Sequence, residues 1–234
     1  MNMDLRKISC LWALLFITLA VSAKVELKVT YTDETGTEVT QTENFTADAP
    51  LVARLSSNAT EEYENASLVW KIRNQKSGIN ITRYDEETTF TFTDAGINAI
   101  TLVVNQQGEA VDSAYIEVTI TESHLEMPNA FSPNNDGHND FYGAKGACHP
   151  EASGHYKSIV EFHAYIFNRH GQKLFDWTDI TKGWDGTYNG HPVKDGVYFV
   201  YVKARGADGV EYDIRKDVNL IRSHNIVNDS NNGQ

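Results

Sequence analysis

The sequence has few cysteines, little positive charge and one long apolar run. Two cysteines among 234 residues are too few for a disulfide framework. Lysine and arginine number 20 against 32 acidic residues, which gives a net charge of −12. Such an excess of negative charge repels phosphate groups, so nucleic acid and anionic membrane surfaces are poor partners. An apolar share of 41% is ordinary for a globular protein and argues against wholesale disorder.

The long apolar run is typical of a processing signal. It spans residues 8–21, follows Arg6 and Lys7, and is shorter than the roughly 20 residues that cross a bilayer. Val21 and Ala23 are the small residues that signal peptidases require before a cleavage site. We therefore predict a signal peptide over residues 1–23, with an uncleaved anchor as the alternative. No later run is long enough for a transmembrane helix, so export into an aqueous compartment is expected.

Residues 24–123 alternate between apolar and polar side chains, as expected of half-buried strands. β-Branched and aromatic residues dominate the alternating runs, which are separated by turn signals. These runs are residues 25–31, 68–72, 88–93, 98–104 and 113–120. About seven short strands in roughly 100 residues predict an immunoglobulin-like sandwich, with Trp70 in its core. A short helix over residues 61–66 is also expected.

Residues 124–222 show the same strand character, and residues 223–234 are a polar tail that we expect to be flexible. Strands are expected at residues 159–168, 172–177, 197–204 and 210–222, with hairpin turns at Gly171 and Gly209. The third of these runs is apolar on both faces, which predicts that both are covered and that a second sheet is present. The predicted fold class is therefore all-β: two tandem immunoglobulin-like β-sandwich domains after a signal peptide.

Four phrases in the second half occur in a fixed order: PNAFSPNNDGHND from Pro128, IFNRHG from Ile166, GWDG from Gly183 and DGVYF from Asp195. The chain from Leu125 to Arg222 resembles the gliding-motility-associated C-terminal domain of the Bacteroidetes. This family is the type B sorting domain of the type IX secretion system. The resemblance implies a β-sandwich that the outer-membrane translocon and attachment machinery recognise, and localisation at the cell surface or outside the cell, reached through the periplasm.

The same resemblance implies which residues carry the sorting motifs or shape them. Trp184 is expected to cap the core, Asp185 to accept backbone N–H groups, and the glycines to adopt unusual backbone angles. Recognition would use the surface that these residues shape, without a catalytic atom. The residues are Pro128, Asn129, Phe131, Pro133, Gly137, Asn168, Arg169, Gly171, Gly183, Trp184, Asp185, Gly186, Gly196 and Tyr198.

One loop carries a candidate metal site, and no other cofactor is predicted. Asn134, Asp136 and Asp140 gather hard oxygen donors around Gly137, and Ca²⁺ prefers such donors. The alternative is a turn in which these side chains bond their own backbone. Cys148, His149 and His155 form a second cluster, but it lacks a fourth ligand at zinc spacing, which favours a surface loop.

These patterns together predict a secreted or cell-surface protein that is not an enzyme. The second domain directs secretion and attachment, and the first resembles PKD or immunoglobulin-like modules that act as spacers or bind a surface glycan or protein. Two alternatives remain open. In the first alternative, the chain is a resident component of the secretion machinery. In the second, it is a small hydrolase or inhibitor that uses loops of the first domain.

Overall fold

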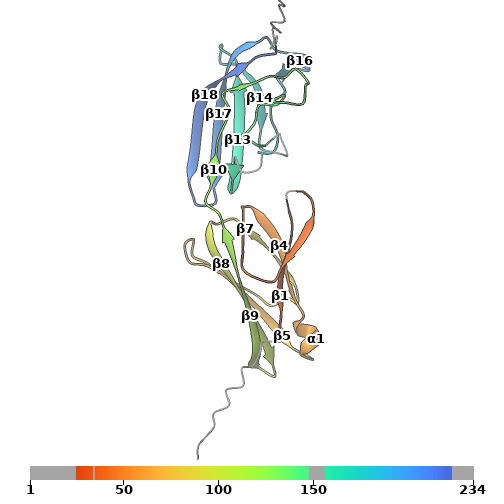
Figure 1. Cartoon of the computed structure of the whole chain (residues 1–234). Coiled ribbons are helices and arrows are strands. Elements are labelled where there is room, and N and C mark those ends of the chain that lie inside the picture. The colour runs from red at the N-terminus through yellow and green to blue at the C-terminus, as the bar shows by residue number, and fades with distance from the viewer. Residues whose placement is uncertain (1–24, 34, 148–155, 223–234) are drawn as a thin grey trace, which may run out of the picture.

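The computed structural model describes residues 25–33, 35–147 and 156–222. They form two β modules arranged end to end in an elongated molecule (Figure 1). The signal-peptide segment, the Cys148–His155 loop and the tail lie outside the described residues. Among the residues that are described, no helix is long and apolar enough to cross a membrane.

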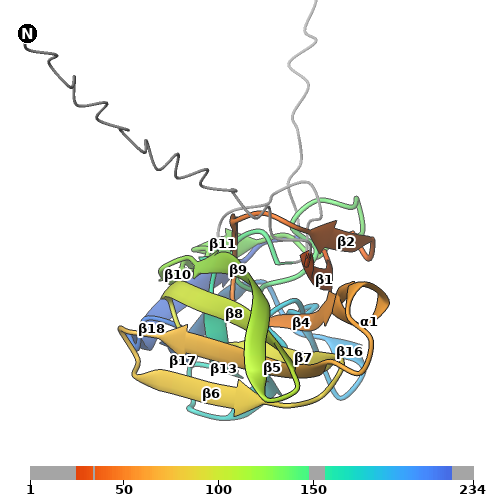
Figure 2. The same cartoon turned by 90° about the horizontal axis from the view of Figure 1, so that it is seen from below.

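The first module consists of two sheets packed face to face. One has the strand order β2-β1-β4-β7 and the other β3-β9-β8-β5-β6, and all neighbours are antiparallel except β3 and β9. Figure 2 looks along the long axis, with this module in front. Its elements are β1 (Leu27–Thr32), β2 (Glu38–Gln41), β3 (Phe45–Ala47), β4 (Leu51–Ser57), α1 (Ala59–Glu62), β5 (Ser67–Asn74), β6 (Ile79–Arg83), β7 (Thr88–Phe92), β8 (Gly96–Gln106) and β9 (Glu109–Ile120).

The alternation seen in the sequence places one face of each long strand in the core of this module. Trp70 on β5 has no exposed surface, as predicted, and its indole N–H donates to the Asp85 carbonyl oxygen at 2.9 Å. Ile100, Leu102 and Val104 alternate along β8 and are equally buried. The sequence analysis missed the short strands β2, β3 and β6 and the strand β4, and it placed the helix two residues too late.

The second module has one large sheet, with the order β11-β18-β17-β13-β14, and two small strand pairs, β10 with β12 and β15 with β16. Its strands are β10 (His124–Leu125), β11 (Ala130–Phe131), β12 (Tyr156–Lys157), β13 (Ile159–Phe167), β14 (Lys173–Trp177), β15 (Thr187–Tyr188), β16 (His191–Pro192), β17 (Gly196–Gly206) and β18 (Glu211–Leu220). The all-β class predicted from the sequence is confirmed.

The reason given for a sandwich in the second half was partly wrong. The inner face of the large sheet, including Val200 and Val202, is buried beneath segments 125–147 and 177–193. These covering segments are loops and two-residue strands rather than a second full sheet. The described residues leave the outer face uncovered: Val197 and Phe199 keep 49% and 46% of their surface exposed. Apolar side chains on both faces of a strand therefore did not mean two covered faces.

Backbone and side-chain hydrogen bonds join the two modules. The Ala95 N–H donates to the Ala207 carbonyl oxygen at 2.9 Å, and the Ala49 N–H to Ser158 Oγ at 3.1 Å. Asp208, in the β17–β18 turn, accepts the Ser123 N–H at 3.0 Å and the Ser123 hydroxyl at 2.7 Å. A Cβ added to Gly206 would lie 2.0 Å from Ser123 Oγ, so this contact requires glycine. These hydrogen bonds fix one module against the other.

Candidate functional site in the second module

Trp184, from the Gly-Trp-Asp-Gly phrase, lies at the centre of the motif residues. Its indole ring has no exposed surface and lies 5.4 Å from the Phe131 ring and 5.2 Å from the Tyr198 ring, measured between centroids. Its indole N–H donates to the Thr187 carbonyl oxygen at 2.7 Å. Trp184 therefore joins the first, third and fourth phrases in one aromatic cluster, which confirms its expected place in the core.

The first phrase is held to this cluster through Tyr142. The backbones of Tyr142 and Trp184 exchange two hydrogen bonds, at 2.8 and 2.9 Å, and the Tyr142 hydroxyl donates to the Pro128 carbonyl oxygen at 3.1 Å. Burial, followed by the nearby charge of Asp217, raises the pKa of the Tyr142 hydroxyl well above its ordinary value. Tyr142 therefore acts as a neutral structural hydrogen-bond donor here.

Asp185 and Gly186 shape the turn that follows Trp184. Asp185 accepts the Thr187 N–H at 2.9 Å and the Thr187 hydroxyl at 2.8 Å, so it bonds the backbone as predicted. Gly186 has a φ of +76°, and a Cβ there would lie 2.9 Å from both Arg222 Nη2 and Pro133 Cγ. Positive φ also occurs at Gly137, Gly171 and Gly196, but not at Gly183, where the expectation is wrong.

Arg222 fastens the end of β18 to the other phrases. Its guanidinium donates to the Gly186 carbonyl oxygen at 2.8 Å and to Asp195 Oδ1 at 3.1 Å, and its backbone N–H donates to Asp195 Oδ2 at 2.8 Å. Because the two oxygens of one carboxylate bond the side chain and the backbone of the same residue, they orient Arg222 more strictly than a single bond would. The third and fourth phrases and the closing strand are thereby fixed to one another.

The second phrase forms a tight turn beside the fourth. The Asn168 side-chain oxygen accepts the N–H groups of His170 and Gln172, at 2.9 and 3.1 Å, which closes the turn before β14. The turn lines an open groove together with the start of β17. The groove-lining residues used here are Asn168, Arg169, His170, Lys194, Asp195 and Val197. All four phrases thus converge on the end of the module that lies away from the junction.

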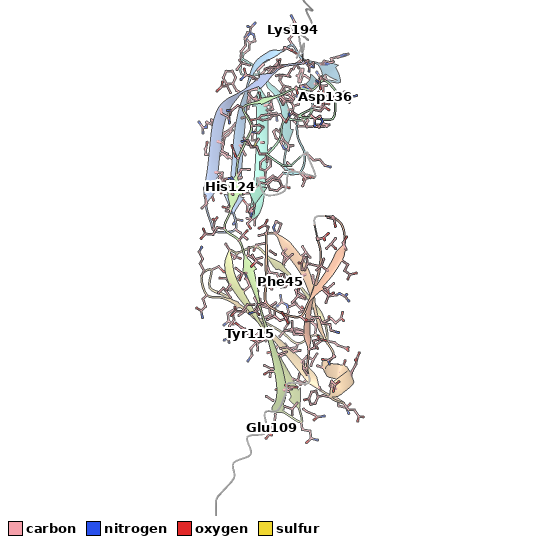
Figure 3. All side chains as sticks on the ribbon, in the orientation of Figure 1. Phe45, Glu109, Tyr115, His124, Asp136 and Lys194 are labelled. Atoms are coloured by element: carbon pink, nitrogen blue, oxygen red, sulfur yellow. The ribbon has the colours of Figure 1, made fainter. Side chains whose placement is uncertain are left out.

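The loop with the candidate calcium ligands lies at the same end, where Asp136 and Lys194 are labelled (Figure 3). Asp140 Oδ1 accepts the N–H groups of Asn134 and Asn135, at 3.0 and 2.6 Å, and Oδ2 accepts that of Gly137 at 2.8 Å. Asp136 accepts the Asn134 side-chain N–H at 2.8 Å and the His138 N–H at 2.8 Å, and these bonds lower the pKa of its carboxyl. The loop is therefore an Asx-rich turn that satisfies its own backbone.

The candidate residues fall into three groups in the structure. Trp184, Tyr198 and Phe131 lie in the core, Asn168 and Asp185 order turns, and Pro133 packs beside Gly186. Asn129 accepts the Asn219 N–H at 2.9 Å and thereby helps to align the first phrase with β18. Within the described parts of the chain, no three His, Cys, Asp or Glu side chains gather as metal ligands. Cys148, His149 and His155 lie outside the described residues.

Sequence reasoning missed two features of the module. One is the Ser123–Asp208 contact at the junction, which no local pattern marks because the two residues are distant in sequence. The other is the group of aromatic rings on the outer face of the large sheet. Its signal was present along 163–167, where it was not noticed, and along 197–201, where it was interpreted as evidence for a covering sheet.

The motif residues thus form an aromatic cluster bound to ordered turns at one end of the second module. Residues 125–215 match the family model described as CHU_C Type IX secretion signal domain. The resemblance found in the sequence is thereby confirmed. The match covers the second module and less than half of the chain, so the assignment applies to that module. A type IX secretion signal domain indicates export to the cell surface or the extracellular space.

A search of curated proteins finds no match. Among solved structures, the chain is similar to a tetra-tandem repeat from the extending region of a large adhesion protein, with 13% identity, 87% of this chain and 68% of that chain covered, and a TM-score of 0.28. It is also similar to dimeric latent PorU from Porphyromonas gingivalis, with 12% identity, 85% and 20% coverage and a TM-score of 0.25. Similarity at this distance carries no inference about function.

Proposed function

We propose that this chain is a non-enzymatic surface or secreted protein in which the second module directs type IX secretion and surface attachment, and the first serves as a spacer or binding module. The observation that carries the proposal is the signal-domain match over residues 125–215. The match supports an interaction with the secretion machinery. Surface attachment, the bacterial group and the role of the first module are parts of the proposal that the match does not cover.

The spacer role is supported by how the first module uses its buried polar groups. Asn74 and Asn98 are almost fully buried, and the Asn74 side-chain N–H donates to Asn98 Oδ1 at 3.1 Å. Both also donate to carbonyl oxygens of residues 94–96, the turn from which Ala95 contacts the second module. Buried amides that order a junction turn stiffen the connection between the modules, which suits a spacer.

Two reciprocal deletions test the proposal in cells that have a type IX secretion system. Removing residues 125–234 should trap the remainder in the periplasm, whereas removing residues 25–121 should leave export intact. Residues 124–234 joined behind a signal peptide and an unrelated folded reporter should carry that reporter to the surface or medium. Immunoblots of periplasm, outer membrane and medium measure all three. Export of the first deletion, or retention of the reporter fusion, would overturn the sorting role.

The alternatives give different results in the same fractionation. A resident component of the machinery would stay in the envelope, and deleting its gene would stop the export of other cargo. A hydrolase or inhibitor would leave export of other cargo unchanged, but the purified full chain would cleave, or inhibit the cleavage of, a polysaccharide or protein substrate. We expect neither outcome.

A further inference from the structure

The outer face of the large sheet carries four aromatic side chains in one compact block. Strand register pairs Tyr165 on β13 with Tyr201 on β17, and Phe167 with Phe199 in the next outward-facing row. The Tyr165 ring lies 6.0 Å from Tyr201 and 6.3 Å from Phe167. We call these four residues the aromatic block.

The aromatic block forms an apolar patch, whereas other exposed apolar side chains do not gather in this way. The block and the neighbouring Val197 face outward across two central strands, and Val197 and Phe199 are about half exposed. On the first module, the exposed large apolar residues are Val52, Tyr84, Ile97, Val111 and Tyr115, and only Val111 and Tyr115 share a strand, β9. A concentrated apolar patch on a sheet face marks an interaction surface, whereas scattered apolar residues do not.

Four charged residues stand at the corners of the aromatic block, and their signs alternate. The register continues each aromatic row onto the flanking strands, so Arg215 and Asp176 end the tyrosine row, and Asp217 and Lys173 end the phenylalanine row. Each edge of the block therefore carries one positive and one negative corner, with like charges on the diagonals. An apolar centre with a charged rim is the usual anatomy of a protein interface.

The corner side chains are held in place by contacts within the chain. Lys173 Nζ lies 2.5 Å from Asp176 Oδ2 and 5.8 Å from the Tyr165 ring centroid. The Arg215 guanidinium lies 4.7 Å above the Tyr201 ring and bonds Asp213 at 3.0 Å. Cations held beside aromatic rings lose less conformational freedom when a partner approaches. The block and its corners are thus preorganised to bind a partner whose apolar and charged groups are arranged in a complementary way.

We propose that this partner is a second copy of the same chain. A two-fold axis running along the strands between two facing sheets would place β18 over the second copy's β14, and β17 over its β13. Arg215 then faces the second copy's Asp176, and Asp217 faces its Lys173. Tyr201 meets Tyr165 and Phe199 meets Phe167, so the apolar centre is covered at the same time. A closed, self-complementary contact of this type is the commonest in homodimers.

The alternating corners favour a second copy over other occupants. A partner of one charge would meet two corners of its own sign. A neutral glycan can form hydrogen bonds with each corner, but it has no need for their signs to alternate. The same two-fold axis also faces Arg205 toward the second copy's Glu161, in a row beyond the block. The two copies would then lie side by side, with both first modules on the same side of the contact.

The size of the face sets the strength expected of this contact. At about 5 Å between strands and about 3.3 Å per residue, the outer face of β13, β14, β17 and β18 measures roughly 15 Å by 35 Å. That is about 500 Å² per copy, below the roughly 800 Å² of a standard stable interface. A weak, concentration-dependent dimer is therefore expected, with a Kd of about 10–500 μM.

Sedimentation equilibrium of the chain without residues 1–23, with Cys148→Ser to prevent disulfide formation, tests the proposal. Phe199→Ser and Asp217→Lys should each raise the dimer Kd by roughly tenfold or more, because one opens the apolar centre and the other turns two attractive contacts into repulsive ones. Ile97→Ser, with a similarly exposed side chain on the first module, is the matched control and should leave the Kd unchanged. Thermal unfolding confirms that each variant is folded.

The sharpest test inverts all four corners in one chain: Lys173→Asp, Asp176→Lys, Arg215→Asp and Asp217→Arg. Under the proposed symmetry, this inverted chain should dimerise with itself as the original chain does. A mixture of the two, with one fluorescently labelled, should form few mixed dimers, because like charges then face each other. A chain that stays monomeric up to about 1 mM, or mixed dimers at the statistical frequency, overturns the proposal. A monomeric chain whose folded Phe199→Ser variant fails to be exported would instead assign the face to the secretion machinery.

Discussion

The two modules bury similar apolar cores in different ways. In the first, two sheets of four and five strands pack against each other, and regular alternation provides the core from both sides. In the second, a single large sheet is covered by loops, and the covering layer depends on a few aromatic residues, above all Trp184, Tyr142 and Phe131. A sheet-covered core distributes its contacts over many residues, whereas a loop-covered core concentrates them in a few anchors.

This difference explains where the motif residues lie. Loops without ladder hydrogen bonds need side-chain partners for their backbone groups, and Asp185, Asn168 and Asp140 provide them. Strands of the first module satisfy their backbone groups through pairing, so their sequence is constrained mainly to alternation. The second module consequently carries phrases rich in turn-forming residues, and the first carries mainly an alternating pattern.

The largest expected effect comes from removing the central anchor of each module. Trp184→Ala should cost about 3–5 kcal/mol, a large part of the roughly 5–15 kcal/mol that stabilises a domain. Trp70→Ala should cost a similar amount in the first module. Differential scanning calorimetry with residue-resolved hydrogen exchange should show each variant unfolding its own module first.

The same variants separate structure from recognition. If Trp184 acts through the core, the exported fraction of Trp184→Ala should fall in proportion to the unfolded fraction of the second module. Both fractions are measured at two growth temperatures. Full stability with lost export would contradict the core role and make Trp184 a direct recognition contact. Loss of export with Trp70→Ala, while the second module stays folded, would contradict the separation of roles between the modules.

The next effect concerns close packing at Gly186. Gly186 and Gly171 share a φ of +76°, but only Gly186 has neighbours within 4 Å of an added Cβ. Alanine at Gly171 should cost about 1–2 kcal/mol through backbone strain alone. Alanine at Gly186 should cost about 1 kcal/mol more, because Pro133, Leu220 and Arg222 must shift. Urea unfolding of both variants measures the difference. Equal costs would show that Pro133, Leu220 and Arg222 move aside without a loss of stability.

The junction is expected to respond to pH through Asp208. Burial opposes the charge on this carboxyl, but hydrogen bonds from the Ser123 side chain and backbone and from the Val210 N–H outweigh burial and lower its pKa below 3.8. A depressed folded-state pKa means that the stabilisation is fully present above the ordinary carboxyl pKa and is lost as pH falls through the folded value. Coupling between the modules should therefore weaken at acid pH.

Asp208→Asn tests this directly. It should cost about 1–2 kcal/mol at neutral pH and separate the unfolding transitions of the two modules. It should also flatten the dependence of that separation on pH as the pH falls below about 5. Asp179→Asn is the matched control, because Asp179 bonds Thr181 within its own turn rather than a residue across the junction. An effect of equal size in the control would show that the contact between Asp208 and Ser123 is not the cause of the destabilisation.

The smallest effect is expected in the Asn134–Asp140 loop. Because both Asp140 oxygens already accept backbone N–H groups, Asp140→Ala should cost about 1 kcal/mol through lost turn bonds, with or without millimolar Ca²⁺. The melting temperature of the unaltered chain should not change on adding Ca²⁺ or chelator. A rise with Ca²⁺ that chelator reverses and Asp136→Ala abolishes would instead support the calcium site, because a ligand of the folded state stabilises it by mass action.

Much of the fold followed from local pattern. Period-two alternation located β5, β8, β9, β13 and β17 to within a few residues, because side chains on a strand reach opposite faces whatever the strand packs against. Strands β2, β3 and β6 were missed because they are short and partly exposed, so burial left little pattern in them. The candidate site followed from its phrases, and the core position of Trp184 followed from its place between two strands.

By itself, the sequence determined the all-β class, the approximate positions of most long strands and the export-related phrases, because each depends on residues close together in the chain. Only the tertiary structure decided that one face of the large sheet stays uncovered, since apolar alternation is the same whether a face meets a second sheet or solvent. Only it brought Ser123 to Asp208 and Arg222 to Gly186, across 85 and 36 residues. Contacts of that range leave no local signal, because what defines them is the path of the chain between them.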